Sequence, residues 1–210
     1  VLRPARSVGG DLYYFQQLGN KLHFIIGDVS DKGVPAALFM AKTVTLYTGA
    51  LNDDLSPGDT FTHMNQALCQ NNDACMFVTA LCGTLDLDTG QLVMANAGHM
   101  HPIQKTQSSS AELVVDGGMA LGLMEDVEYA NVLHTLDRHT SLLMYTDGIS
   151  EAFNTEREIY EEERLLAFVA REKDINADAL GTSSLADVEK FVDGAEQSDD
   201  ITLMVIHYGD

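Results

Sequence analysis

Four acidic positions stand beside glycine or a second acid, a setting that suits metal binding. They are Asp11 after Gly9-Gly10, Asp28 after Gly27, Asp147 before Gly148, and Asp199 before Asp200. Carboxylate oxygens are the ligands that hard divalent cations such as Mg²⁺ and Mn²⁺ prefer. A cluster of them could hold two cations that share a bridging water, lower its pKa and offset the charge that develops in phosphoryl transfer. We therefore ask whether the four positions form one site.

Each acid also has a simpler interpretation. Asp-Gly is a common turn, so Asp147-Gly148 alone carries little information, and Asp28 alone could cap a helix. A calcium-binding EF-hand loop starting at Asp28 fails on spacing, because its fifth position would be Lys32 and its twelfth Phe39.

The surrounding sequence predicts that the acids lie at strand ends. Residues 12–18 have strong strand propensity, and the apolar run 22–26 reads as the returning strand after the turn signal Gly19-Asn20. Antiparallel pairing of these strands places Asp11 and Asp28 at one end of the sheet. The strand expected at 140–145 leads into Asp147, and a final strand is expected at 199–208.

The remaining pattern predicts an α+β fold. Helices are expected at 34–51, from Ser56 to about Asn71, at 161–173 and at 185–192; further strands are expected at 1–6, 76–87, 92–97, 103–106, 113–115 and 128–136. The helix at 34–51 is apolar nearly all round, which predicts that it is buried between layers. Regular strand–helix alternation is missing, so we expect antiparallel sheets with helices packed outside, in a single domain spanning 1–210.

The amino-acid composition argues against several classes of binding partner and against a membrane-spanning segment. The net charge is −20, from 32 acidic and 12 basic residues, which argues against a nucleic-acid or anionic-lipid partner, although acidity also serves solubility. Cys69, Cys75 and Cys82 form no metal-binding pair, which favours reduced, buried thiols in a cytoplasmic setting. No apolar run reaches about 18 residues, so no transmembrane helix is expected.

Five motifs resemble those of the SpoIIE/RsbU-type phosphatases, the bacterial branch of the metal-dependent type 2C (PPM) Ser/Thr phosphatases. In order, they are Ser7-Val8-Gly9-Gly10-Asp11-Leu12-Tyr13, Gly27-Asp28-Val29-Ser30-Asp31-Lys32-Gly33-Val34-Pro35-Ala36-Ala37-Leu38, Asn96-Ala97-Gly98-His99, Tyr145-Thr146-Asp147-Gly148-Ile149-Ser150-Glu151-Ala152 and Asp199-Asp200-Ile201-Thr202. One motif alone is weak, but the five together are specific and span nearly the whole chain.

The resemblance implies a fold and a site. The fold is a sandwich of two antiparallel β-sheets flanked by helices (α-β-β-α), with two Mn²⁺ or Mg²⁺ ions between the sheets. Asp28 would bridge both metals and the Val29 carbonyl would add a ligand; Asp147 and Asp199 would bind one metal, Asp11 the other. Asp200 would orient the neighbouring ligand Asp199 without binding the metal directly. Asp28, Asp147 and Asp199 would thereby act in catalysis through the metal-bridging water.

Other positions depart from the family or stay open. Ser30 replaces a histidine of eukaryotic members, and Asp31-Lys32-Gly33 stands where bacterial relatives often have Gly-His-Gly, so the general acid is not identified. Arg6 lies off the position of the eukaryotic phosphate-binding arginine. Lys32 is a hypothetical substrate-binding residue, and a solvated surface lysine is an equal alternative. His99 is more consistent with backbone hydrogen bonding at a hairpin end than with ligation.

The resulting expectation is a metal-dependent phosphatase acting on phosphoserine or phosphothreonine, typically of a STAS-type anti-sigma-factor antagonist in a partner-switching cascade. The alternatives are a catalytically inactive partner-binding domain of the same fold and a small-molecule phosphoesterase. Because the chain begins at Val1 without Met, we expect a cytoplasmic output domain of a longer protein that has an upstream sensor and could be membrane-anchored. It could also form a homodimer.

Overall fold

The chain folds into two compact units. The computed structural model describes residues 1–5 and 9–209. One unit, here the α1/α2 unit, comprises Arg6–His99 and Val115–Leu136; the other, the α4/α5 unit, comprises Val1–Ala5, Met100–Val114 and Asp137–Asp210. Each contains one five-stranded sheet in which all paired strands are antiparallel. This confirms the expected α+β class with antiparallel sheets and helices outside.

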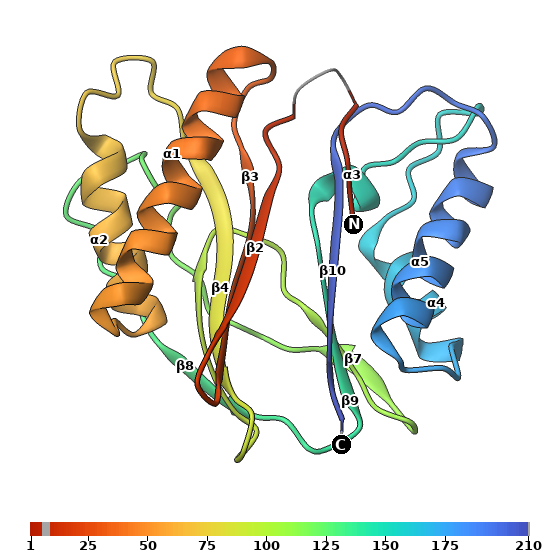
Figure 1. Ribbon diagram of the computed structural model, residues 1–210. Helices are drawn as coiled ribbons and strands as arrows, with labels where there is room; N and C mark the ends of the chain where they lie inside the picture. The colour runs from red at the N-terminus through yellow and green to blue at the C-terminus, as the bar shows by residue number, and fades with distance from the viewer. Residues whose placement is uncertain (6–8, 210) are drawn as a thin grey trace. The chain divides into compact units, whose positions relative to one another are not determined.

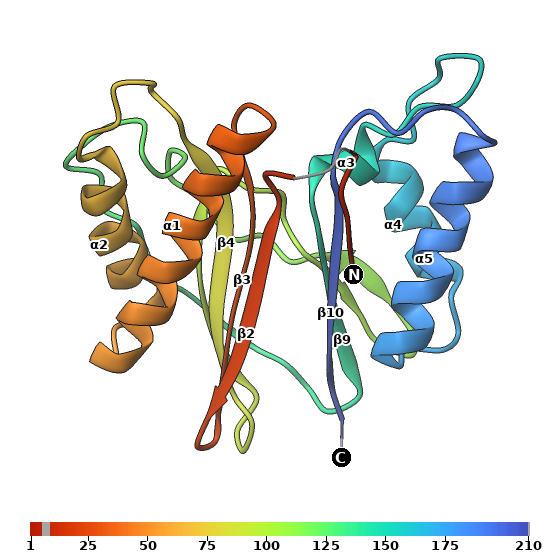
Figure 2. The same cartoon turned by 45° about the horizontal axis from the view of Figure 1, so that its top comes forward.

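In the α1/α2 unit the sheet order is β2-β3-β4-β5-β8. The strands are β2 (Leu12–Leu18), β3 (Lys21–Val29), β4 (Val78–Asp86), β5 (Gln91–Ala97) and β8 (Val132–Thr135); the helices are α1 (Val34–Ala50), the 3₁₀ turn η1 (Leu51–Asp53) and α2 (Pro57–Cys69). The helices α1 and α2 lie side by side on one face of this sheet (Figures 1 and 2).

Local chemistry explains where these two helices begin and how they attach. α1 has Pro35 in its first turn, where a missing N–H costs nothing. Ser56 caps α2 by accepting a hydrogen bond from the Asp59 backbone N–H at 3.3 Å. The buried Tyr47 hydroxyl donates to the Phe24 carbonyl oxygen at 2.8 Å, which ties α1 to β3.

The prediction that α1 is buried on all sides is wrong. Its buried residues form one face against the sheet, while Val34 and Leu38 are 66% and 68% exposed. Among the described residues, the stretch Val34–Asp53 is long and apolar enough to cross a membrane by length and composition alone, contrary to the sequence expectation. A core helix passes the same test, and the buried face of α1 packs with β3 and α2 in the core of its unit.

In the α4/α5 unit the sheet order is β1-β10-β9-β6-β7. The strands are β1 (Leu2–Arg3), β6 (Ile103–Lys105), β7 (Ser110–Glu112), β9 (Thr140–Tyr145) and β10 (Ile201–Tyr208); the helices are α3 (Asp147–Ser150), α4 (Glu162–Arg171) and α5 (Ala177–Val192). The core joins β9, β10, α4 and α5 through Leu143, Leu203, Leu165 and Leu185.

The strand expected at 1–6 is described over Leu2–Arg3, and three further predicted boundaries are changed by local contacts. The strand expected at 113–115 lies at Ser110–Glu112, because a tight turn closed by Thr106 and Ser109 starts it earlier. The strand expected at 128–136 pairs only over Val132–Thr135, since Tyr129 leaves the ladder to bond Thr62 and Met119. The helix expected at 185–192 begins at Ala177, where Asn176 caps it.

Candidate functional site

Asp11 and Asp28 lie at the same end of the β2–β3 hairpin. The register pairs Leu12 with Gly27, so Asp11 continues the ladder opposite Asp28. Strand alternation puts both acids on the face opposite Leu12 and Val29, which pack in the core with the helices. Asp28 lies within β3, paired with Thr79, rather than just past the strand end as the sequence predicted.

Gly10 allows the backbone to come close to this acid pair. A Cβ at Gly10 would lie 3.0 Å from the Val29 carbonyl oxygen and 3.5 Å from Asp28 Oδ1. The Asp11 side chain is 2% exposed, and a buried carboxylate needs compensating partners. The region therefore gathers carboxylate and carbonyl oxygens in a confined space.

The α4/α5 unit brings a second set of acids together where β9 ends and β10 begins. Thr146 follows β9, and its side-chain Oγ1 accepts from the Thr202 N–H at 3.0 Å, while its own N–H donates to the Thr202 carbonyl at 3.1 Å. Asp147 then opens the short helix α3. This register places Asp147 beside the segment that carries Asp199 and Asp200.

Gly148 lies closer to Asp200 than Gly10 lies to Val29. A Cβ at Gly148 would lie 1.8 Å from the Asp200 carbonyl oxygen, so only glycine fits. The Asp200 side chain is 7% exposed, and its Oδ1 accepts the Ala5 backbone N–H at 2.7 Å. Asp199 Oδ1 accepts the Asp200 N–H at 2.9 Å.

The structure thus assembles two acidic sets, one in each unit. Asp11, Asp28 and the Val29 carbonyl belong to the α1/α2 unit; Asp147, Asp199 and Asp200 belong to the α4/α5 unit. All six donors are hard oxygens, and both sets have a glycine pressed against them, which fits Mg²⁺ or Mn²⁺ and not a thiolate-seeking metal. Across residues 1–5 and 9–209, no group of three or more His, Cys, Asp or Glu side chains is gathered to hold a metal by itself. Each set would therefore be completed by other oxygen ligands.

Ser30 and His99 have structural roles here. The Ser30 Oγ accepts the Phe77 N–H at 2.9 Å and the Ser30 N–H donates to the Phe77 carbonyl at 2.8 Å, which extends the β3–β4 pairing beyond Asp28. His99 is buried, and its N–H and carbonyl both bond the Asn96 side chain, as expected for a hairpin-end histidine. Its Nδ1 also lies 3.3 Å from Thr79 Oγ1, across from Asp28.

Lys32 and Arg6 are the remaining positions singled out in the sequence. Lys32 is exposed in the loop before α1, where its backbone N–H bonds Asp31 Oδ1 at 2.9 Å. Arg6, Ser7 and Val8 lie outside the described residues.

Sequence reasoning missed the partners of Asp199 and Asp200. The Gln197 Nε2 donates to the Arg3 carbonyl at 2.9 Å and to the Asp199 carbonyl at 2.7 Å. No local pattern signals this contact, because Arg3 and Gln197 are joined only when β1 pairs with β10.

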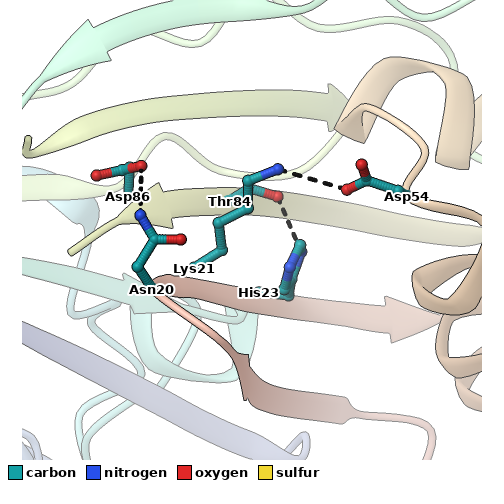
Figure 3. Close-up of polar contacts among 6 residues, drawn as sticks. All are labelled: Asn20, Lys21, His23, Asp54, Thr84 and Asp86. Carbon is teal, nitrogen blue, oxygen red and sulfur yellow. Dashed lines mark hydrogen bonds and ion pairs between the residues drawn. The ribbon is translucent and has the colours of Figure 1, made fainter. Parts of the chain in front are cut away.

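A separate polar cluster lies at the opposite end of β3 (Figure 3). Lys21 Nζ is 3.4 Å from Asp54 Oδ1, Asn20 donates to Asp86 at 3.1 Å, and His23 Nδ1 is 3.1 Å from Thr84 Oγ1. Burial, and secondarily the positive charge of Lys21, lowers the pKa of His23, with Asp54 opposing. A lysine inside the cluster argues against a cation site.

Comparison with solved structures identifies the class of fold. The SiaA-PP2C domain of Pseudomonas aeruginosa superposes with a TM-score of 0.85 at 20% identity, over 99% of this chain and 84% of that one. Two antiparallel sheets with flanking helices thus form a PP2C-type fold.

Comparison of sequences then identifies the family. The model for stage II sporulation protein E (SpoIIE) matches residues 19–209, so the chain belongs to the SpoIIE family. It is 28% identical to Protein IcfG of Synechocystis sp. over 99% of this chain and 37% of that protein. It is 26% identical to the phosphoserine phosphatase RsbU of Bacillus subtilis over 97% of this chain and 60% of that protein. The chain therefore spans between about a third and three fifths of the length of these relatives.

Proposed function

We propose that this chain is a Mn²⁺- or Mg²⁺-dependent protein phosphatase domain that hydrolyses phosphoserine or phosphothreonine. The observation that carries the proposal is the pair of glycine-backed acidic sets, Asp11 with Asp28 and Asp147 with Asp199-Asp200, in a SpoIIE-family chain with a PP2C-type fold. The relative named phosphoserine phosphatase supports the same reaction.

Each residue has a proposed role. Asp28 would bind both of two cations and the Val29 carbonyl would add a ligand; Asp147 and Asp199 would bind one cation, and Asp11 the other. Asp200, whose Oδ1 is held by the Ala5 N–H, orients Asp199. Bound cations supply the positive charge that a phosphate ester needs beside a chain of net charge −20. We place Lys32 near the substrate phosphate.

The proposed substrate is a phosphorylated STAS-type anti-sigma-factor antagonist, in a partner-switching cascade controlled by a sensor domain upstream in the same chain. We further propose that the domain works in the cytoplasm and that a homodimer is a candidate assembly.

The decisive experiment measures phosphate release from three substrates: a phosphorylated STAS-type protein, a phosphoserine peptide and p-nitrophenyl phosphate. Each is assayed with Mn²⁺, Mg²⁺ and EDTA. We expect turnover of the protein with metal and none with EDTA. Turnover of the small ester alone would favour the small-molecule phosphoesterase, and no turnover in any metal would favour the inactive partner-binding domain.

Variants link the activity to the acids and test whether both sets serve one centre. We expect Asp28→Asn and Asp147→Asn each to lower turnover about 10²-fold or more, with the exposed Asp137→Asn as control. If both serve one centre, the double variant loses little more than either single one, because residues acting as a unit are non-additive. Additive losses would contradict a shared centre.

A further inference from the structure

The loop that leads into Asp199 and Asp200 is largely exposed, although Asp200 itself is buried. Between α5 and β10, Asp193 and Gly194 both have positive φ, at 47° and 84°. Residues 193–198 are largely exposed, and Ala195 to Ser198 line a cavity of about 170 Å³ together with Gly148, Val188 and Ile201. Because a cavity lies behind the loop, side-chain packing contributes little to its position there.

Hydrogen bonds from Gln197 replace that packing. Its amide nitrogen has two hydrogens, and the structure directs one to the Arg3 carbonyl and the other to the Asp199 carbonyl, at 2.9 and 2.7 Å. One side chain thereby joins the N-terminal strand to the main chain of a predicted metal ligand.

The N-terminal strand is itself anchored on both sides. β1 pairs with β10 through Leu2 with Thr202 and Arg3 with Ile201, and the N-terminal segment runs along β10 in Figures 1 and 2. Arg3 forms an ion pair with Glu189 of α5. Ala5, at the end of this segment, donates its N–H to Asp200 Oδ1 at 2.7 Å.

We infer that Gln197 is a positioning residue: with the segment Leu2 to Ala5 it forms a clasp that holds Asp199 and Asp200 ready for the cation. The clasp rests on the proposed function, because it assumes that these acids bind metal. An ordered acid loses less conformational freedom when it binds, so the clasp raises metal affinity without touching the metal. Through the hydrogen bonds of Arg3 and Ala5, a displacement of the N-terminal segment would also displace Asp199 and Asp200.

The test compares Gln197→Glu, which keeps the side-chain shape but removes both donated hydrogen bonds, with Gln197→Ala. The matched control is Gln107→Ala, an exposed glutamine in a loop of the same unit. The first measurement is amide hydrogen exchange by NMR in the metal-free protein. We expect faster exchange at Ala5 and Asp200 in both Gln197 variants, with the β9–β10 ladder amides and the urea unfolding midpoint unchanged.

The second measurement is Mn²⁺ affinity by calorimetry. We expect both Gln197 variants to bind Mn²⁺ about 10-fold more weakly, with the control at the parent value. Unchanged amide exchange at Ala5 and Asp200 in the Gln197 variants overturns the clasp, whatever the metal affinity is. Faster exchange with the parent's Mn²⁺ affinity overturns the positioning role. A parent that binds no Mn²⁺ overturns the proposed function and the positioning role with it, while the exchange data still decide whether the clasp orders the loop.

Discussion

The main chain of Gly148 packs directly on Asp200. A Cβ at Gly148 would lie 1.8 Å from the Asp200 carbonyl oxygen and 2.8 Å from its carbonyl carbon. Both partners are backbone, so no flexible side chain can move aside. The glycine after Asp147 is therefore required by the close approach of α3 to the segment before β10, in addition to any turn preference of the Asp-Gly pair.

Replacing this glycine tests the contact. We expect Gly148→Ala to destabilise the protein by about 1–3 kcal/mol through overpacking and to weaken Mn²⁺ binding by displacing Asp147 from Asp200. Urea unfolding and a Mn²⁺ titration measure the two effects. Gly49→Ala is the control: it lies in α1 with no atom within 4 Å of the added Cβ, so it should stabilise by about 0.4–1 kcal/mol. A Gly148→Ala protein with parental stability would contradict the packing.

The buried His23 should make stability depend on pH. Its pKa is lowered in the folded state from 6.5, so the unfolded chain takes up a proton first as the pH falls. The free energy of unfolding therefore falls as the pH drops from 6.5 to the lower folded-state pKa of His23. The full stability contribution is present above pH 6.5. We expect His23→Gln to flatten this fall in urea midpoints, and the exposed His63→Gln to leave it unchanged. Parallel pH profiles for the His23→Gln variant and the parent would show that His23 does not cause the loss of stability at low pH.

The Ser56 side chain stabilises the start of α2. It accepts the Asp59 N–H at 3.3 Å and an Asn131 Nδ2 hydrogen bond at 2.9 Å. We expect Ser56→Ala to lower the free energy of unfolding by about 1 kcal/mol, the usual cost of a lost N-cap. Urea denaturation measures it, with the exposed Ser108→Ala within about 0.5 kcal/mol of the parent. Equal losses in the two variants would mean that the cap contributes nothing specific.

Lys32 can be tested by separating binding from turnover. If its ammonium contacts the substrate phosphate in both ground and transition states, Lys32→Ala should raise KM for the phosphoprotein about 2- to 5-fold, as for an exposed ion pair, and leave kcat unchanged. The exposed Lys190→Ala serves as the control of equal charge change. Unchanged kcat and KM in Lys32→Ala would leave this residue a solvated surface lysine.

Strand periodicity and turn residues were sufficient to predict much of the fold. The β2–β3 hairpin formed around Gly19-Asn20, with Asp11 and Asp28 at one end, because strand propensity and turn chemistry are local. Predictions went wrong where tertiary contacts competed. Tyr129 left its expected strand to bond Thr62 and Met119, and α1 exposed Val34 and Leu38 although its composition suggested full burial.

Sequence by itself determined which residues could do the chemistry, because carboxylates beside glycine and the order of five motifs are readable along the chain. Tertiary structure alone decided what surrounds them. Gly10 against Val29, Gly148 against Asp200, and Gln197 between Arg3 and Asp199 each join residues distant in sequence. Such contacts depend on which strands pair, a property that residue type and local spacing do not encode.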